Sequence, residues 1–231
     1  MSEALIVADA LTKEFAGFAA VRDVTFALPQ GSRTALLGGN GAGKTTLLEV
    51  LVRLASPTRG TSRVGPADVD EVERRAAVGY LGDRPMLYEE LTPLENLDFF
   101  SRLYNRPDEA RVEELLRAVG LWTRRHSTTA TLSRGFHQRL GMARALVHAP
   151  SVLLLDEPET GLDVAAVELL DATMLMAPGL TVLASTHRLD RIDHWCDGVL
   201  RLDRGRLVED TASRATVTPP TAATGGAGGA Q

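Results

Sequence analysis

One glycine-rich segment constrains the possible folds of this chain more than any other. Residues 37–46 read LGGNGAGKTT and fit the pattern G-x-x-x-x-G-K-[ST] at Gly38, Gly43, Lys44 and Thr45. The glycines let the backbone curl so that successive N–H groups point at a phosphate chain. Lys44 adds a point charge toward the outer phosphates, and the Thr45 hydroxyl can bind Mg²⁺. The segment therefore predicts a loop that binds the phosphates of a nucleotide.

The residues around this loop have the order that such a loop requires. Residues 34–37 form an apolar run that predicts a buried strand, and residues 45–51 predict a helix that follows the loop. The positive N-terminal end of that helix faces the phosphates. The residues expected to contact the nucleotide are Gly38, Gly39, Asn40, Gly41, Ala42, Gly43, Lys44, Thr45 and Thr46.

The use of lysine supports this interpretation. Lys and Arg together number 25, but lysine occurs only at Lys13 and Lys44. A chain that uses arginine for almost every cation has lysine where a compact charge must fit inside a loop. The alternative is a Gly-rich turn formed by chance, and this use of lysine argues against it.

The composition limits the class of protein. A chain of 231 residues, 44% of them hydrophobic, is long enough for one large domain with ample core. The net charge of −5 gives no bulk electrostatic reason to bind nucleic acid. The single cysteine, Cys196, excludes an internal disulfide and suits a reducing compartment. No apolar run approaches the roughly 18–20 residues of a membrane span, and Met1 opens no signal peptide, so we expect another polypeptide to cross any membrane involved.

The pattern of apolar residues predicts an α/β fold. Strands are expected at residues 5–11, 24–28, 78–81, 151–156 and 181–185, with a closing hairpin at 198–202 and 206–209. A turn is expected at residues 57–60 and helices at 164–176 and 188–195. Strands that alternate with helices indicate βαβ units. We therefore predict a phosphate-loop NTPase core with a mostly parallel sheet, an N-terminal antiparallel β subdomain and a helical insertion.

The helical insertion is expected at about residues 87–149. Thr92 can cap a helix that begins at Pro93, with Glu95 as the capping-box glutamate, and a second helix is expected at residues 108–119. These elements belong to one domain at residues 1–211. Residues 212–231 consist mainly of Ala, Thr, Gly and Pro, which cannot bury enough apolar surface to fold, so we predict a disordered tail.

Two carboxylates follow an apolar strand directly. Residues 153–157 read LLLDE, so the strand ends in Asp156 and Glu157. In a phosphate-loop NTPase the first carboxylate holds the Mg²⁺ shell, and the second is placed to orient or deprotonate the attacking water. The alternative is a strand that simply ends in solvated acids.

Two further features have more than one interpretation. In the segment 132–135, which reads LSRG, Ser133 can cap a helix whose N-terminus binds an anion, and Gly135 allows close approach. On its own the segment could equally be the start of a capped amphipathic helix. Phe15 and Phe18 precede the glycine-rich loop, and either could stack on a nucleotide base or belong to the core.

Taken together, these motifs resemble the nucleotide-binding subunit of an ATP-binding-cassette (ABC) transporter. The family's motifs occur in the family's order at residues 38–45, 132–135, 155–158, 160–163 and 185–187, and the resemblance covers about residues 5–209. It implies that Phe15, rather than Phe18, stacks on adenine. It also implies that Asp156 holds Mg²⁺, that Glu157 is the catalytic base, and that His187 contacts the γ-phosphate, with Lys44 completing the catalytic set.

The resemblance further implies a shared site between two cassettes. Ser133 and Gly135 would contact the γ-phosphate of ATP held by the partner cassette, and Asp163 would lie in the loop through which the two cassettes meet. The partner would be a second copy or a paralogue, in a head-to-tail sandwich around ATP and Mg²⁺.

Two segments depart from the family pattern. The signature at residues 132–136 reads LSRGF, where the family most often has LSGGQ. Residues 81–85 read LGDRP, where the family usually has a glutamine that reaches Mg²⁺ and water. A carboxylate can accept a hydrogen bond from a Mg²⁺-bound water, so we expect Asp83 to replace the glutamine on the metal side. Arg84 cannot ligate a cation but could reach a phosphate oxygen.

The resemblance implies an ATPase that powers a separate transmembrane permease at the cytoplasmic face of the cell membrane, without nucleic acid as a partner. The signature and the segments 80–82 and 87–92 look most like the ATPase of bacterial cytochrome c maturation haem exporters. The alternatives are a drug or lipid export ATPase of the same family and a soluble ABC ATPase of DNA repair or translation. A phosphate-loop kinase or GTPase would lack the segment 132–135.

Overall fold

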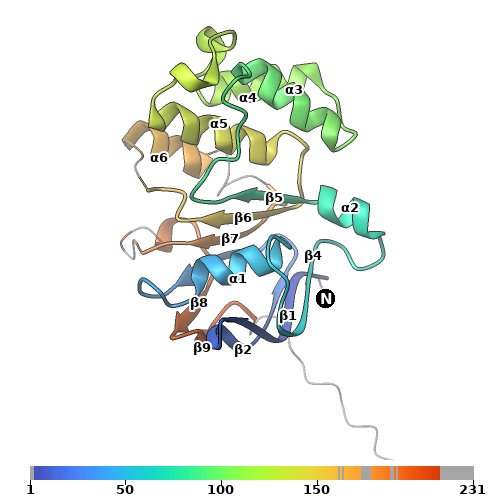
Figure 1. The fold of residues 1–231 in the computed structure, drawn as a ribbon, viewed down its shortest axis with the longest axis vertical. Helices are drawn as coiled ribbons and strands as arrows, with labels where there is room; N and C mark the ends of the chain where they lie inside the picture. Colours follow the sequence, from blue (N-terminus) through green and yellow to red (C-terminus); the bar gives the residue numbers. More distant parts are fainter. Residues whose placement is uncertain are drawn as a thin grey trace, which may run out of the picture.

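The computed structural model describes residues 3–160, 162, 164–172, 178–187, 190 and 192–213. These residues form a three-stranded antiparallel sheet and a six-stranded, mostly parallel sheet, with helices beyond the larger sheet (Figure 1). The smaller sheet has the order β2-β1-β4, and the larger has the order β5-β6-β7-β3-β8-β9. The predicted α/β fold with an N-terminal antiparallel sheet is confirmed.

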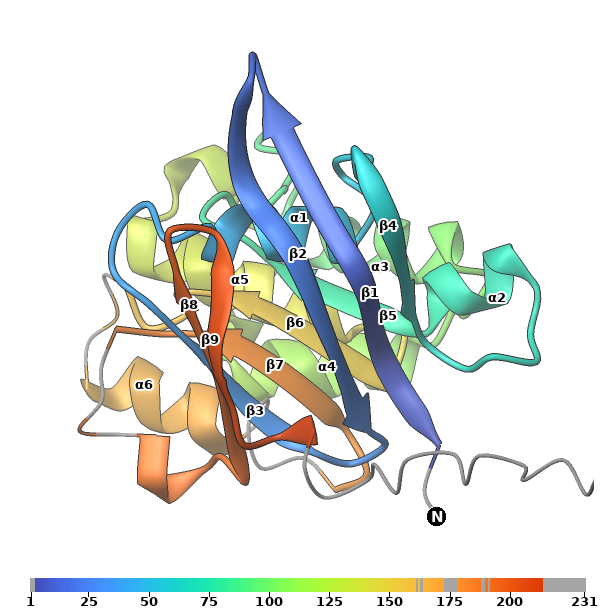
Figure 2. The same cartoon turned by 90° about the horizontal axis from the view of Figure 1, so that it is seen from below.

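The antiparallel sheet is built around a long hairpin of β1 (Ala4–Phe15) and β2 (Phe18–Pro29). Its two-residue turn, Ala16 and Gly17, has positive φ at both positions (47° and 83°), which matches the twist of paired antiparallel strands. The tip of the hairpin projects beyond the rest of the fold (Figure 2). The turn therefore places the side chains of its flanking residues, Phe15 and Phe18, at the surface.

The predicted turn at residues 57–60 is wrong in its second half. Strand β4 (Arg59–Val64) begins there and pairs with β1. A Cβ at Gly60 would lie 2.3 Å from the Ala10 carbonyl oxygen, so this glycine allows two backbones to approach closely. The strand lies at an edge, and its first three side chains are exposed. It therefore lacks the apolar alternation by which a strand is predicted.

The larger sheet contains the strands β3 (Arg33–Leu37), β5 (Val78–Leu81), β6 (Val152–Asp156), β7 (Thr181–Ser185), β8 (Gly198–Asp203) and β9 (Arg206–Asp210). All the pairings are parallel except that between β8 and β9. Helix α1 (Lys44–Leu51) shares one apolar core with the antiparallel sheet. A second core lies on the other face of the larger sheet. The result is a layered body whose parallel strands end near the start of α1.

The helices that cover this second core gather at one end of the molecule (Figure 1). They include α3 (Pro93–Leu103), α4 (Glu109–Ala118) and α5 (Arg134–Leu146), with the 3-10 turns η1 (Trp122–Arg124) and η2 (Thr129–Thr131) between α4 and α5. The predicted capping box is present, since Thr92 Oγ1 accepts from Glu95 N at 3.2 Å and Glu95 Oε2 accepts from Thr92 N at 2.8 Å. Helix α4 lies within the predicted range 108–119, and Asp108 caps it. No helix among the described residues is long and apolar enough to cross a membrane.

One helix was not predicted, one predicted helix is described only in part, and one predicted helix is a short 3-10 turn. Helix α2 (Glu71–Ala76) was not expected, and it has no buried residue that would mark it in the sequence. Helix α6 (Val164–Leu170) falls within the predicted range 164–176, of which residues 173–177 are not described. In the predicted helix 188–195, the described part forms only the 3-10 turn η4 (Ile192–His194). There the N–H groups of Trp195 and Cys196 both donate to the Ile192 carbonyl, which closes the turn.

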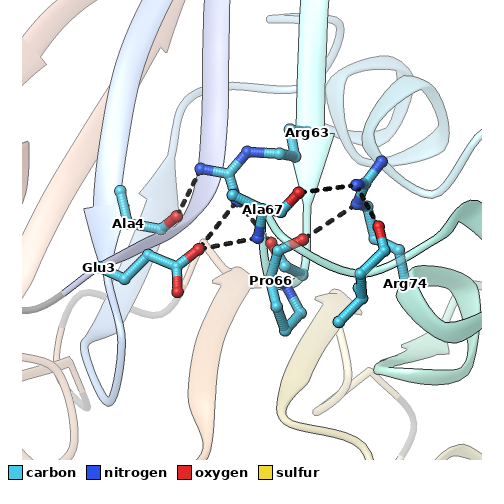
Figure 3. A network of polar contacts seen from close by, with 8 residues as sticks. Glu3, Ala4, Arg63, Pro66, Ala67 and Arg74 are labelled. Carbon is cyan, nitrogen blue, oxygen red and sulfur yellow. Dashed lines mark hydrogen bonds and ion pairs between the residues drawn. The ribbon is translucent and has the colours of Figure 1, made fainter.

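The polypeptide around α2 is held by polar contacts instead of apolar packing (Figure 3). Arg63 donates to the carbonyls of Ala4 and Gly65 at 2.9 and 2.7 Å. Arg74 donates to three further carbonyls in the connection between β4 and α2, among them that of Pro66. Two guanidinium groups therefore fix a connection that has few apolar contacts of its own.

The folded part of the chain extends beyond the predicted boundary at residue 211. The N–H of Thr211 donates to Val199 O at 2.9 Å, and the N–H of Ala27 donates to Ser213 Oγ at 3.1 Å. Ala212 and Ser213 are both buried. These two residues therefore pack against the folded domain, and of the predicted tail only residues 214–231 lie outside the described part.

Candidate functional site

A cavity of about 690 Å³ lies where β3 and β6 end and α1 begins. In an open parallel sheet, ligands bind outside the carboxyl ends of the strands. The predicted site residues that line it are Phe15, Asn40, Gly41, Ala42, Gly43, Lys44, Thr45, Thr46, Asp83, Asp156 and Glu157. Residues far apart in the sequence therefore meet in one cavity.

The glycine-rich loop needs glycine at two positions for steric reasons. Gly38 and Gly43 have φ of 153° and 103°. A Cβ at Gly38 would lie 2.6 Å from Leu202 O, and one at Gly43 would lie 2.3 Å from Ala20 O. Gly43 precedes α1 and offers no side-chain hydrogen bond to its first N–H groups. Those N–H groups are therefore available to an anion.

Lys44 is almost enclosed by the loop. Its side chain is only 6% exposed, and Nζ donates to Gly38 O at 2.9 Å and to Gly39 O at 3.4 Å. Nζ also lies 3.6 Å from Glu157 Oε1. Thr45, the next residue, is exposed and lines the cavity. The loop therefore holds a fixed cation, and Thr45 adds a hydroxyl at the cavity wall.

The two carboxylates at the end of β6 have different environments. Asp156 is buried, and Ser185 Oγ donates to its Oδ1 at 2.6 Å. Glu157 has a left-handed backbone (φ 46°), which is uncommon for a residue with a side chain. Its backbone N–H donates to Ser185 Oγ at 2.8 Å, and its side chain is one-third exposed. Both carboxylates line the cavity, but Asp156 is buried and bonded to Ser185, whereas Glu157 is more exposed and has an unusual backbone conformation.

His187 lies near this pair. Its Nδ1 is 3.8 Å from Glu157 Oε2, so Glu157 lies between the ring of His187 and the ammonium of Lys44. Ser185, two residues earlier, was not among the expected site residues. It lies at the end of β7 beside the end of β6, within the motif 185–187. That position in the motif is the signal that could have identified it.

The site has oxygen donors that suit Mg²⁺. No group of three or more His, Cys, Asp or Glu side chains within the described part of the chain could hold a metal ion alone. Mg²⁺ in nucleotide sites is usually bound through one or two carboxylates together with substrate phosphates. Thr45, Asp156 and Asp83 offer a hydroxyl and two carboxylates to the same cavity. Arg84 is exposed but does not line the cavity.

The two phenylalanines at the hairpin tip both line the cavity. Phe15 is 48% exposed and Phe18 is 64% exposed, so the interpretation of either as a core residue is wrong. The ammonium of Lys13 lies 4.8 Å from the centre of the Phe15 ring. The geometry leaves both rings able to stack on a base, and the choice of Phe15 stays a prediction.

Two predicted residues of the signature segment, Ser133 and Gly135, lie outside the nucleotide cavity of their own chain. Ser133 caps α5 by accepting from Phe136 N at 3.4 Å, and it is exposed. A Cβ on Gly135 would meet no atom within 4 Å, so the space beside it is open. Although Arg134 lines the cavity, Ser133 and Gly135 do not. Asp163, the other residue expected to act between cassettes, lies outside the described residues.

A phosphate loop followed by a strand that ends in Asp-Glu, on this layered sheet, defines a nucleotide-binding ATPase cassette. The sequence model of the family described as "ABC transporter" matches residues 21–160. The chain belongs to the ABC transporter family, as an ATP-binding subunit with an ABC ATPase domain.

Curated relatives agree with this assignment. The chain is 35% identical over 198 residues to the ABC transporter ATP-binding protein NatA of Bacillus subtilis, with 82% of this chain and 80% of the relative covered. It is 33% identical over 213 residues to the bacitracin transport ATP-binding protein BcrA of Enterococcus faecalis, with 90% and 69% covered.

Solved structures have the same fold. An ATP-binding subunit of an ABC transporter superposes with a TM-score of 0.83 at 32% identity, with 90% of each chain covered. The dimeric structure of a bacterial ABC transporter cassette superposes with a TM-score of 0.80 at 25% identity, with 90% of this chain and 99% of the other covered.

Proposed function

We propose that this chain hydrolyses Mg²⁺-bound ATP to drive a separate transmembrane exporter subunit. The observation that carries the proposal is the position of Glu157 in the nucleotide cavity, 3.6 Å from Lys44 and 3.8 Å from His187. Lys44 binds the outer phosphates, and Glu157 activates the attacking water. Asp156, Thr45 and Asp83 would hold Mg²⁺, which would neutralise charge on the phosphates. His187 contacts the transferred phosphoryl group.

The active unit in this proposal is a dimer of cassettes. Ser133 and Gly135 are accessible and lie outside the cavity of their own chain, which supports a role at the nucleotide of a second cassette. A bacterial cassette of the same fold has been solved as a dimer. Asp163 and the exposed N-terminal end of α5 contribute to the contact between the two cassettes.

The transmembrane partner binds the helical insertion. We use "insertion surface" for the residues Met86, Leu87, Tyr88, Leu91, Phe99 and Phe100. Met86, Tyr88 and Phe99 are 43%, 46% and 39% exposed, whereas Leu87 and Phe100 pack against the core. Exposed aromatic and methionine side chains whose neighbours pack against the core can bind a helix of a membrane protein. This contact holds the chain at the cytoplasmic face of the membrane.

The cargo in this proposal is a drug-like or lipid-like compound. BcrA, one of the relatives reported above, is named for the transport of bacitracin. Neither of those two relatives is named for haem. Export of a drug-like or lipid-like compound is therefore favoured over export of haem for cytochrome c maturation.

The role of Glu157 is tested by Glu157→Gln, which retains size and hydrogen bonding but removes the base. We expect turnover to fall by roughly 10²-fold or more while ATP affinity is retained, because only water activation is lost. The dimer should then accumulate in size-exclusion chromatography with ATP. The control is Glu113→Gln on the exposed face of α4, which should have the wild-type rate. Near-normal turnover of Glu157→Gln would remove Glu157 from this role.

A further inference from the structure

Lys13 is one of only two lysines in the chain, and the phosphate loop accounts only for the other, Lys44. It lies on β1, two residues before Phe15, near the tip of the projecting hairpin (Figure 2). Phe15 lines the nucleotide cavity, whereas Lys13 does not. Lys13 is therefore placed behind a residue of the cavity wall.

The ammonium of Lys13 makes two contacts at once. Its Nζ donates to Ser56 O at 2.8 Å and lies 4.8 Å from the centre of the Phe15 ring. An ammonium has three N–H donors, so it can bond a carbonyl while its charge faces an aromatic ring. Ser56 belongs to the segment between α1 and β4, and α1 begins at the phosphate loop. One side chain thus connects the Phe15 ring to the part of the fold that carries the loop.

The backbone around Lys13 is held to the same segment. The N–H of Thr58 donates to Thr12 O at 2.8 Å, and the N–H of Glu14 donates to Thr58 Oγ1 at 3.0 Å. The side chains of Glu14 and Arg59 form an ion pair at 3.0 Å. These contacts fix the backbone of the hairpin, whereas the contact of Lys13 fixes the ring.

The second phenylalanine of the hairpin is held less closely. Phe18 is the more exposed of the two rings. The guanidinium carbon of Arg22 lies 6.0 Å from the centre of the Phe18 ring, which is about the outer limit of a cation–π contact. The Nε of Arg22 donates to Ala19 O, within the same strand. Phe15 is therefore better ordered before a ligand arrives, and an ordered ring loses less entropy on binding.

We infer that Lys13 is a positioning residue for nucleotide binding, whose ammonium holds the Phe15 ring in the orientation that stacks on the base of ATP. The ammonium covers one face of the ring, and the base stacks on the face directed at the cavity. This inference rests on the proposed binding of ATP in the cavity and on the predicted stacking of Phe15. It also accounts for the second lysine of an arginine-rich chain.

The test compares a ligand that has a base with one that has none. Calorimetry gives the dissociation constant of ADP, and displacement of ADP gives that of inorganic pyrophosphate. Lys13→Met keeps a stem of similar length but removes the charge and the donor, so we expect it to weaken ADP binding about fourfold. Pyrophosphate should keep its wild-type dissociation constant, because it makes no contact with the ring. A general loss of structure would instead weaken both ligands.

A double-variant cycle tests whether Lys13 acts through the ring. Phe15→Ala should weaken ADP binding roughly tenfold or more, because it removes the stacking surface. Adding Lys13→Met to Phe15→Ala should cause no further loss, since the ring that the ammonium holds is absent. The KM for ATP should rise in Lys13→Met with kcat unchanged, the pattern for a lost binding contact.

Two matched variants control for the loss of a cation near the hairpin tip. Arg59→Met removes the partner of Glu14, and Arg22→Met removes the cation beside Phe18. Both should keep the wild-type dissociation constant of ADP. The melting temperatures of Lys13→Met and wild type should agree within about 2 °C, because the contact lies at the surface.

The possible failures are distinguishable. If the wild-type chain does not bind ADP, the proposed function fails. If Phe15→Ala binds ADP normally, the predicted stacking of Phe15 fails and this inference fails with it, while ATP hydrolysis by Glu157 is untouched. If Phe15→Ala binds weakly but Lys13→Met does not, only this inference is overturned. Additive losses in the double variant, or equal weakening of ADP and pyrophosphate by Lys13→Met, would also overturn it.

Discussion

At the scale of single residues, the buried charged side chains of the site have hydrogen-bond partners and line the nucleotide cavity. Lys44 is surrounded by loop carbonyls and Glu157, and Asp156 by the Ser185 hydroxyl. His148 is the contrasting case. It is 2% exposed, its ring stacks on Tyr104 at 4.0 Å, and Nε2 lies 3.1 Å from Val78 O. This histidine has the Val78 carbonyl as an acceptor for one N–H, and the charges that act on it in the described part of the chain are the cations Arg144 and Arg106.

The burial of His148 predicts a loss of stability in mild acid. Burial lowers its pKa to about 4, helped by the nearby charges of Arg144 and Arg106, whereas the ordinary value is 6.5. Between these values the unfolded chain binds a proton that the folded chain does not, so stability is complete above pH 6.5 and falls as the pH drops toward 4. At pH 5 the expected loss is roughly 2 kcal/mol.

Urea unfolding at pH 7.5 and pH 5.0 measures this loss. His148→Gln should reduce the difference between the two pH values by most of that amount, since the group that titrates is gone. His126→Gln, at an exposed histidine, should keep the wild-type difference. Equal differences in wild type and His148→Gln would contradict the prediction.

At the scale of elements, the sequence predicts best where the local signal and the packing agree. The capping box at Thr92 and Glu95 marks the start of α3, and the apolar run before Asp156 marks β6. β4 and α2 could not be predicted in the same way. β4 is an edge strand whose first three side chains are exposed, and α2 has no buried residue, while Arg74 within it donates to carbonyls of the irregular connection that precedes it. Such contacts exist only after the chain has folded.

The insertion surface gives a prediction at this scale. The backbone of Tyr88 is held by buried Asn96, which bonds both its N–H and its carbonyl at 2.9 Å, while its ring is exposed and lies edge-on to Phe99 at 5.0 Å. We therefore expect Tyr88→Arg to abolish co-purification with the transmembrane subunit and to leave the melting temperature of the isolated chain unchanged.

A matched change elsewhere controls for the added charge. Val208→Arg, at an exposed apolar position of β9, should leave co-purification intact. If Tyr88→Arg lowers the melting temperature by several degrees, the ring belongs to the core of the insertion and not to a docking surface.

At the scale of the whole molecule, the site depends on residues that are distant in the sequence. Motif spacing predicted the loop, Asp156 and Glu157, because each adjoins a strand whose end is fixed by the sheet. It did not predict Ser185 beside Asp156, because that contact depends on the pairing of β6 with β7. It also did not predict that Phe15 and Phe18 both reach the cavity, because that depends on the projection of the hairpin.

Two deletions test where the folded domain ends. Removal of residues 218–231 should leave both the melting temperature and the ATPase rate unchanged, because that segment has too little apolar content to be buried. Removal of residues 211–231 should lower the melting temperature by several degrees, because it exposes the surface under Ala212 and removes the acceptor of the Ala27 N–H. Equal melting temperatures for the two deletions, or a marked decrease for the shorter one, would contradict this boundary.

The enclosure of Lys44 also has a consequence for covalent chemistry on the whole protein. Primary amines occur on only two of its side chains, and one of them is buried among loop carbonyls. Acetylation and other acylating reagents therefore leave the arginine charges of the surface unaltered. Among side-chain amines they are directed to Lys13, whose ammonium lies over the Phe15 ring at the edge of the nucleotide cavity. A label attached to Lys13 would therefore lie beside the base of a bound nucleotide, and its signal would report nucleotide binding.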